Sequence, residues 1–255
     1  MKIAAILRQV PDVVEELVIA EDGQSLDETE VMYITNELDE NALEQALILK
    51  GRHDAQVTAY GVGGDEARDA LATSVAKGAD EAVFIPLEFK DRGDSHKLAA
   101  HLVNVLKEGG YNLVLTGVQA TDEVDYGLGG LLAANLSWSY IGGLAAVEID
   151  PSGSKAVVKK EYPGGRLGLM EVTLPAILGM QASEQPPRYV PVSKVMQTKK
   201  TLQVKEVKTP APETTGVHIK KLLKPEVGAK AEMIEGDEEK IATTIANLLK
   251  ERGLL

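Results

Sequence analysis

Short apolar runs alternate with helical hydrophobic periods through the first half of the chain. The runs at 2–7, 56–60, 82–86 and 112–116 have the length and composition of buried β-strands. Residues 40–50, 65–78, 95–107 and 127–136 follow these runs in turn and are predicted helices. Alternation of strand and helix at this spacing predicts an α/β fold with a doubly wound, mostly parallel sheet.

The pattern changes after Trp138, where turn residues instead of helical periods separate the apolar runs. Strand-like runs at 145–149, 155–161, 167–172 and 176–180 are divided by Pro151-Ser152-Gly153 and by Pro163-Gly164-Gly165. Turns of this kind connect neighbouring strands. We therefore predict antiparallel strands that extend the parallel sheet.

From Gln181 the regular pattern stops. Prolines at 186, 187, 210 and 212 and the basic pair at 199–200 predict an extended arm without packed elements. A last helix begins near Asp237 and carries an apolar stripe of Ile241, Ile245, Leu248 and Leu249. We divide the chain into an α/β domain over 1–185 and an arm with a terminal helix over 186–255. The stripe packs either on a partner or on the chain's own domain.

Composition narrows the class of protein. The net charge of −12 over 255 residues argues against a nucleic-acid partner, which requires a basic face. The absence of cysteine excludes disulfides, thiolate catalysis and Cys-ligated metal centres. No segment has the length of a membrane span, and the apolar run at 1–7, followed at once by Arg8, is interpreted as a strand and not as a signal peptide. The expected location is the cytoplasm, or an organelle interior.

Three loops are expected at the carboxyl ends of strands, where open α/β sheets bind ligands. They are residues 8–12, residues 61–64 and residues 117–122, and the last precedes a helix that starts with Gly127, Gly129 and Gly130. Glycines let backbone N–H groups approach a phosphate, and a helix N-terminus favours negative charge. Together the loops indicate a nucleotide site. The alternative is that the glycines serve tight turns and close helix–sheet packing.

Catalytic constellations are poor. The four histidines show no ligand spacing, and no serine elbow or lysine-bearing phosphate loop is present. Asp122, Glu123 and Asp125 fit a metal cluster or a capped, solvated helix start, and we favour the second. The sequence thus predicts a binding protein with no catalytic residue and no metal.

Several passages, in the same order along nearly the whole chain, resemble the β subunits of electron transfer flavoproteins. The resemblance rests on Arg8-Gln9-Val10-Pro11-Asp12, the Asn36 motif through Ala46, 63–80, Gly117-Val118-Gln119 with Asp122, Glu161 with Gly164-Gly165, Leu174-Pro175-Ala176, and 187–200. In that family, the α subunit holds a redox-active FAD. The β subunit cradles the flavin domain, and in most members it binds AMP as a structural ligand.

The resemblance also implies site residues and partners. The implied AMP site comprises Ile6, Asn36, Asp39, Gly61, Val62, Gly63, Gln119, Asp122, Tyr126, Gly127, Leu128 and Gly129. Glu161 is implied to pair with the α subunit. Arg188, Tyr189, Val192 and Met196 are implied to lie in the recognition loop that docks on a dehydrogenase, with Val192 as the anchor. A eukaryotic member would reside in the mitochondrial matrix.

The chain departs from the family pattern at three places. Glu37 replaces the usual proline after Asn36, and Val192 stands where a leucine is usual. Tyr126-Gly127-Leu128 replaces an Asn-Gln-Thr run, which removes side-chain donors from the phosphate site. AMP is then held more weakly, or the ligand differs. The alternatives are a bifurcating-type β subunit with a second FAD, a stand-alone adenine-nucleotide-binding regulatory protein, and a nucleotide hydrolase.

Overall fold

The computed structural model describes residues 1–210, 217–225, 228 and 231–255. Contacts within the chain divide it into two units, Met1–Lys221 and Leu222–Leu255. The first unit contains the sheet and six of the helices described below, and the second contains the last helix.

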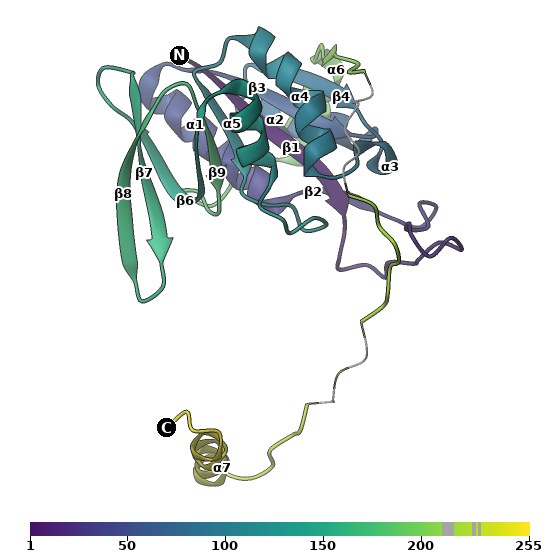
Figure 1. Ribbon diagram of the computed structural model, residues 1–255, viewed down its shortest axis with the longest axis vertical. Coiled ribbons are helices and arrows are strands. Elements are labelled where there is room, and N and C mark those ends of the chain that lie inside the picture. Colours follow the sequence, from purple (N-terminus) through teal and green to yellow (C-terminus); the bar gives the residue numbers. More distant parts are fainter. Residues whose placement is uncertain (211–216, 226–227, 229–230) are drawn as a thin grey trace. The chain divides into compact units, whose positions relative to one another are not determined.

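The first unit is built on a sheet whose strands run in the order β10-β4-β3-β1-β5-β9-β6-β7-β8 (Figure 1). All neighbours from β10 to β6 are parallel, whereas β7 is antiparallel to both of its neighbours, β6 and β8. The strands are β1 (Lys2–Pro11), β3 (Gln56–Gly63), β4 (Glu81–Pro86), β5 (Leu113–Gly117), β6 (Ser139–Ile149), β7 (Lys155–Tyr162), β8 (Arg166–Thr173), β9 (Ala176–Met180) and β10 (Lys205–Glu206). The α/β class with a mostly parallel sheet and an antiparallel extension is confirmed.

Successive side chains of a strand point to opposite faces of the sheet, and in the parallel strands both sets are apolar. Helices therefore cover both faces. In β1, Ile3, Ala5 and Leu7 face one core, and Ala4 and Ile6 face the other. The first core includes helices α1 (Glu37–His53) and α2 (Glu66–Lys77). The second includes α4 (Ser95–Gly109) and α5 (Leu128–Leu136), and the short helix α3 (Phe89–Arg92) lies just before α4.

Two of the three predicted ligand loops are in fact strand. β1 continues through Pro11 because a short strand, β2 (Tyr33–Thr35), pairs antiparallel with its end. β3 likewise continues to Gly63, with residues 61–63 paired to 84–86 of β4. Pairing with a neighbour thus extended both strands beyond their apolar runs. Of the three predicted loops, Asp12, Gly64 and the residues after Gly117 lie outside the strands.

Two further expectations are corrected. β9 does not belong to the antiparallel extension, because after the β7–β8 hairpin the chain returns between β5 and β6 and pairs parallel with both. The segment after Gln181 is not uniformly extended. It forms helix α6 (Val192–Thr201), which contacts α2 and pairs Lys199 with Asp69, and then β10, which adds a parallel edge strand beside β4.

The second unit contains helix α7 (Glu238–Glu251), as the periodicity predicts. The Asp237 side chain accepts a hydrogen bond from the backbone N–H of Lys240 at 2.9 Å and so caps its start. No residue of α7 is buried, and Ile245 and Leu248 on its apolar stripe are exposed. Within the described part of the chain, no helix is long and apolar enough to cross a membrane.

The close approach of α1 to β5 yields a stability prediction. A Cβ at Gly117 would lie 2.6 Å from Asp39 Oδ1 and 2.7 Å from the Leu38 carbonyl carbon, so Gly117→Ala should lower the free energy of unfolding by about 2 kcal/mol. At Gly51, within α1, a Cβ would meet nothing within 4 Å. Gly51→Ala should therefore stabilise the protein by roughly 0.5–1 kcal/mol. Urea unfolding checks both, and equal effects of the two substitutions would contradict the packing argument.

Candidate functional site

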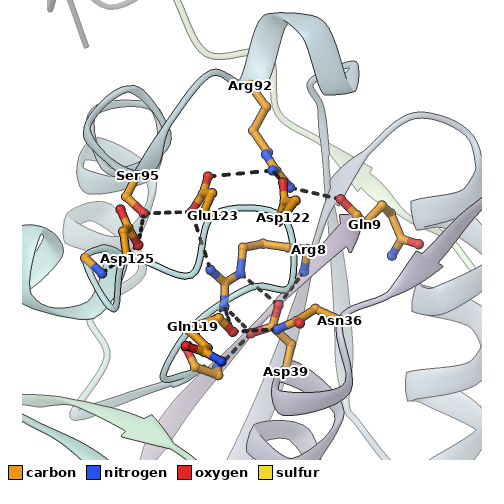
Figure 2. A network of polar contacts seen from close by, with 12 residues as sticks. Arg8, Gln9, Asn36, Asp39, Arg92, Ser95, Gln119, Asp122, Glu123 and Asp125 are labelled. Carbon is orange, nitrogen blue, oxygen red and sulfur yellow. Dashed lines mark hydrogen bonds and ion pairs between the residues drawn. The ribbon is translucent and has the colours of Figure 1, made fainter. Parts of the chain in front are cut away.

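A buried ion pair lies where β1, β5 and the start of α1 meet. The Arg8 guanidinium donates from Nε to Asp39 Oδ2 at 2.9 Å and from Nη2 to Oδ1 at 2.8 Å (Figure 2). The backbone N–H groups of Arg8 and Gly117 donate to the same carboxylate at 2.9 and 2.7 Å. Asp39 lies in the first turn of α1, where the helix dipole also favours its charge. Both side chains are almost completely buried.

The same arginine holds the loop after β5. Arg8 Nη2 donates to the carbonyl oxygens of Gly117 and Gln119, each at 3.1 Å, and Asn36 Nδ2 donates to the Gln119 carbonyl at 2.9 Å. Burial alone lowers the pKa of Arg8, but the charge and hydrogen bonds of Asp39 outweigh burial and raise that pKa above its ordinary value. Arg8 therefore stays charged and connects strand β1 to helix α1 and to the loop after β5.

A second buried arginine reaches the loop from the other side. Arg92, at the end of α3, donates to the Gln9 carbonyl at 2.9 Å and pairs with Asp122. Its Nη2 also lies 3.6 Å from Glu123 Oε1. Burial raises the pKa of the Glu123 carboxyl, although Arg92 and a hydrogen bond from Ser95 oppose that shift. The loop thus carries Glu123 in a setting that disfavours its charge.

The chain turns sharply before α5. Val124 and Tyr126 have φ values of 51° and 56°, in the left-handed region. Asp125 Oδ1 accepts a hydrogen bond from the Gly127 N–H at 2.8 Å, and the Ser95 hydroxyl lies 2.7 Å from Glu123 Oε2 and 3.1 Å from Asp125 Oδ1. Ser95 is fully buried at the start of α4. The two carboxylates therefore converge on one hydroxyl (Figure 2).

The network brings together four of the residues predicted for the nucleotide site: Asn36, Asp39, Gln119 and Asp122. The predicted residues that are buried elsewhere in the fold are Ile6, Gly61, Val62, Gly63, Leu128 and Gly129. Gly127 donates to Asp125, and the Tyr126 side chain is 52% exposed. The part of each residue in ligand binding stays a prediction.

Two of the glycines are explained by packing, which was the open alternative. A Cβ at Gly61 would lie 2.8 Å from Leu71 Cγ, and a Cβ at Gly129 would lie 2.4 Å from the Tyr140 ring. Protein atoms of α2 and β6 therefore occupy the space that the missing side chains leave. Glycine at these positions allows close helix–sheet contact, whether or not a ligand binds nearby.

Sequence reasoning placed Arg8 in a candidate loop but not among the site residues, and it missed Arg92 and Ser95. For Glu123 and Asp125 it favoured a solvated helix start over a metal cluster. A signal for Arg8 existed, since an arginine directly after a buried run requires a partner for its charge. No local signal marks Arg92 or Ser95, because the fold alone brings α3 and α4 to this loop.

Several buried polar atoms of the network have no hydrogen-bond partner in the protein. Four are acceptors, namely Asn36 Oδ1, Gln119 Oε1, Asp122 Oδ1 and Glu123 Oε1, and one is the donor Arg92 Nε. Buried polar groups are normally paired, with water or a ligand where protein atoms do not serve. The excess of acceptors favours a ligand that donates hydrogen bonds.

The predicted docking residues fall in two places. Glu161 lines a cavity of about 450 Å³ together with Tyr126, Tyr140 and Lys160. Arg188 forms an ion pair with the buried Glu44 of α1, with Nη2 and Oε1 2.7 Å apart. That contact fixes the chain just before α6, where Tyr189, Val192 and Met196 are exposed. Their role in docking stays a prediction.

Comparison with known proteins agrees with the resemblance. Residues 25–212 match the family model of the electron transfer flavoprotein domain. The chain is 30% identical to the electron transfer flavoprotein subunit beta of Methylophilus methylotrophus, over 98% of both chains. It is 32% identical to the subunit of the same name from Bacillus subtilis, over 73% of this chain and 71% of that one. The mitochondrial subunit beta of Arabidopsis thaliana is 29% identical over 78% of each chain.

The buried ion pair gives a second stability prediction. Asp39→Asn leaves the Arg8 charge buried without its counter-ion, so the free energy of unfolding should fall by about 3–5 kcal/mol. Glu171→Gln serves as the control, because it breaks the Lys155–Glu171 pair, whose side chains are exposed. That change should cost about 1 kcal/mol or less. Urea unfolding measures both free energies. A loss for Asp39→Asn as small as that of the control would show that the Arg8–Asp39 pair contributes little to stability.

Proposed function

This chain belongs to the electron transfer flavoprotein family as a β subunit, and we propose that it pairs with an FAD-bearing α subunit and cradles its flavin domain. Electrons then pass from a dehydrogenase to an acceptor through the flavin, which supplies the redox chemistry. The residues of this chain bind, orient and dock. The described residues contain no group of three or more acids or histidines that could hold a metal ion.

The observation that carries the proposal is the apolar stripe of α7. None of the fourteen residues of this helix is buried. The apolar side chains of Ile245 and Leu248, on one face, are 45% and 42% exposed. Leu254 and Leu255, just beyond it, are 67% and 73% exposed. An amphipathic helix gains stability by burying its apolar face, and a run of exposed apolar side chains is typical of a protein–protein interface. We assign this face to the α subunit.

A second surface supports docking of a dehydrogenase. The Arg188–Glu44 pair holds the segment before α6, and α6 itself packs against α2. Val192 and Met196 lie one helical turn apart on α6 and are 71% and 51% exposed. A fixed helix that presents two apolar side chains fits the anchor that the family uses, with Val192 as the residue that enters the partner.

The nucleotide is proposed on chemical grounds. The unpartnered oxygens of Asn36, Gln119, Asp122 and Glu123 suit the hydroxyl and amino donors of an adenosine. AMP and FAD share that adenosine, so the same atoms serve either ligand. The fit does not extend to the phosphate of AMP, which only accepts hydrogen bonds and carries negative charge, whereas the loop is rich in acceptors and acids. AMP therefore stays a prediction for this chain.

The α7 interface can be tested by one charge. Ile245→Asp places a carboxylate on the apolar stripe, so it should weaken association with the α subunit at least tenfold, about 1.4 kcal/mol. Asn247→Asp adds the same charge off the stripe and should leave association within about twofold of the wild type. Co-expression followed by size-exclusion chromatography and titration measures both. Equal behaviour of the two variants would remove α7 from the interface.

The docking surface has its own test. Val192→Asp should slow reduction of the heterodimer's flavin by its cognate dehydrogenase about tenfold or more, because a charge replaces an apolar anchor. The flavin absorption spectrum should stay unchanged. Ser193→Asp, at an exposed neighbour on α6, is the matched control and should retain wild-type rates in stopped-flow measurements. Normal rates for Val192→Asp would exclude the anchor role.

A further inference from the structure

A carboxylate of the protein itself, that of Asp125, lies at the start of α5. The Asp125 carboxylate accepts the Gly127 N–H at 2.8 Å, and Gly127 is the N-cap residue of α5 with no side chain of its own to cap the helix. An anion at a helix N-terminus is stabilised by the free N–H groups and by the helix dipole. A nucleotide phosphate at this helix would compete with Asp125 for that place.

The surrounding charges reinforce this competition. Asp122, Glu123 and Asp125 lie within four residues, and Arg92 is the cation that pairs with the first two. Arg8 reaches Glu123 only at 4.0 Å, and its guanidinium is committed to Asp39. Burial already raises the pKa of Glu123. A phosphate brought to this loop therefore meets more negative than positive charge.

Backbone geometry holds Asp125 in position. The left-handed conformations at Val124 and Tyr126, on either side of Asp125, turn the chain back on itself. The buried hydroxyl of Ser95 lies within hydrogen-bonding distance of Glu123 and Asp125 together, so the acids are tied to the start of α4 (Figure 2). In the same network, Asn36 is 1% exposed and its Oδ1 has no hydrogen-bond partner. The site is thus polar, and the Asp125 carboxylate accepts the N–H of the N-cap residue of α5.

We propose that Asp125 determines the specificity of this site by taking the position of a nucleotide phosphate at the start of α5. The inference rests on the proposed function, in which the site accepts an adenosine. It follows that the chain folds and pairs with its α subunit without AMP, and that it disfavours AMP relative to the uncharged nucleoside.

The first experiment is performed on the intact heterodimer. The complex is purified by size-exclusion chromatography and denatured, and the released nucleotides are identified and counted by mass spectrometry. We expect FAD from the α subunit and less than about one-tenth of an AMP per β chain. AMP near one per chain would overturn the inference and leave the heterodimer, and hence the proposed subunit function, intact.

The second experiment measures AMP and adenosine binding to the wild type, Asp125→Asn and Asp22→Asn by isothermal titration calorimetry on the heterodimer. Asparagine keeps an oxygen for the Gly127 N–H and removes the charge. Asp125→Asn should bind AMP at least tenfold more tightly than the wild type, with adenosine affinity changed less than threefold. Asp22, whose Oδ1 likewise accepts the backbone N–H two residues on, from Gln24, is the matched control and should behave as the wild type. An unchanged AMP affinity in Asp125→Asn, including no binding in either protein, would overturn the proposal.

Discussion

The structure depends on one buried contact, the ion pair between Arg8 and Asp39. Four hydrogen bonds converge on the Asp39 carboxylate, two from the Arg8 side chain and one each from the backbone of Arg8 and Gly117. Together they join the end of β1, the first turn of α1 and the end of β5. A buried charge with fewer partners is strongly destabilising, so each of these elements is held in register with the others. Gly117 is required there because no Cβ fits between β5 and α1.

The candidate ligand site is a consequence of that arrangement. Since Arg8 also binds the carbonyl oxygens of Gly117 and Gln119, the loop after β5 lies against the start of α1, and Asn36 reaches it. Arg92 holds the next part of the loop through Asp122. The result is a rigid, polar loop with unpaired acceptors at its centre and an acid at the helix start. In the proposed function, the charge of this loop decides which part of a nucleotide it accepts.

The proposed association with other proteins uses different parts of the chain. The Arg188–Glu44 pair and the contact of α6 with α2 present Val192 and Met196 on a fixed helix. In the second unit, Leu222–Leu255, helix α7 has no buried residue. In the proposed function, the chain binds an α subunit through one surface and a dehydrogenase through another. A large amphipathic face suits the first task, and a small apolar anchor suits the second.

The sequence by itself determined the elements that depend on local periodicity. The α/β class, the helices at 65–78 and 95–107, the hairpin strands and the terminal helix all follow from spacing and turn residues, and the order of motifs along the chain determined the family. Tertiary structure decided the rest. Strand pairing extended β1 and β3 through two expected loops, placed β9 in parallel between β5 and β6, and made β10 an edge strand. Only the fold brings Arg92 and Ser95 to the loop of Asp122, Glu123 and Asp125. Periodicity reports which face of an element is buried, whereas partners distant in sequence are chosen by packing and by the need to neutralise buried charge.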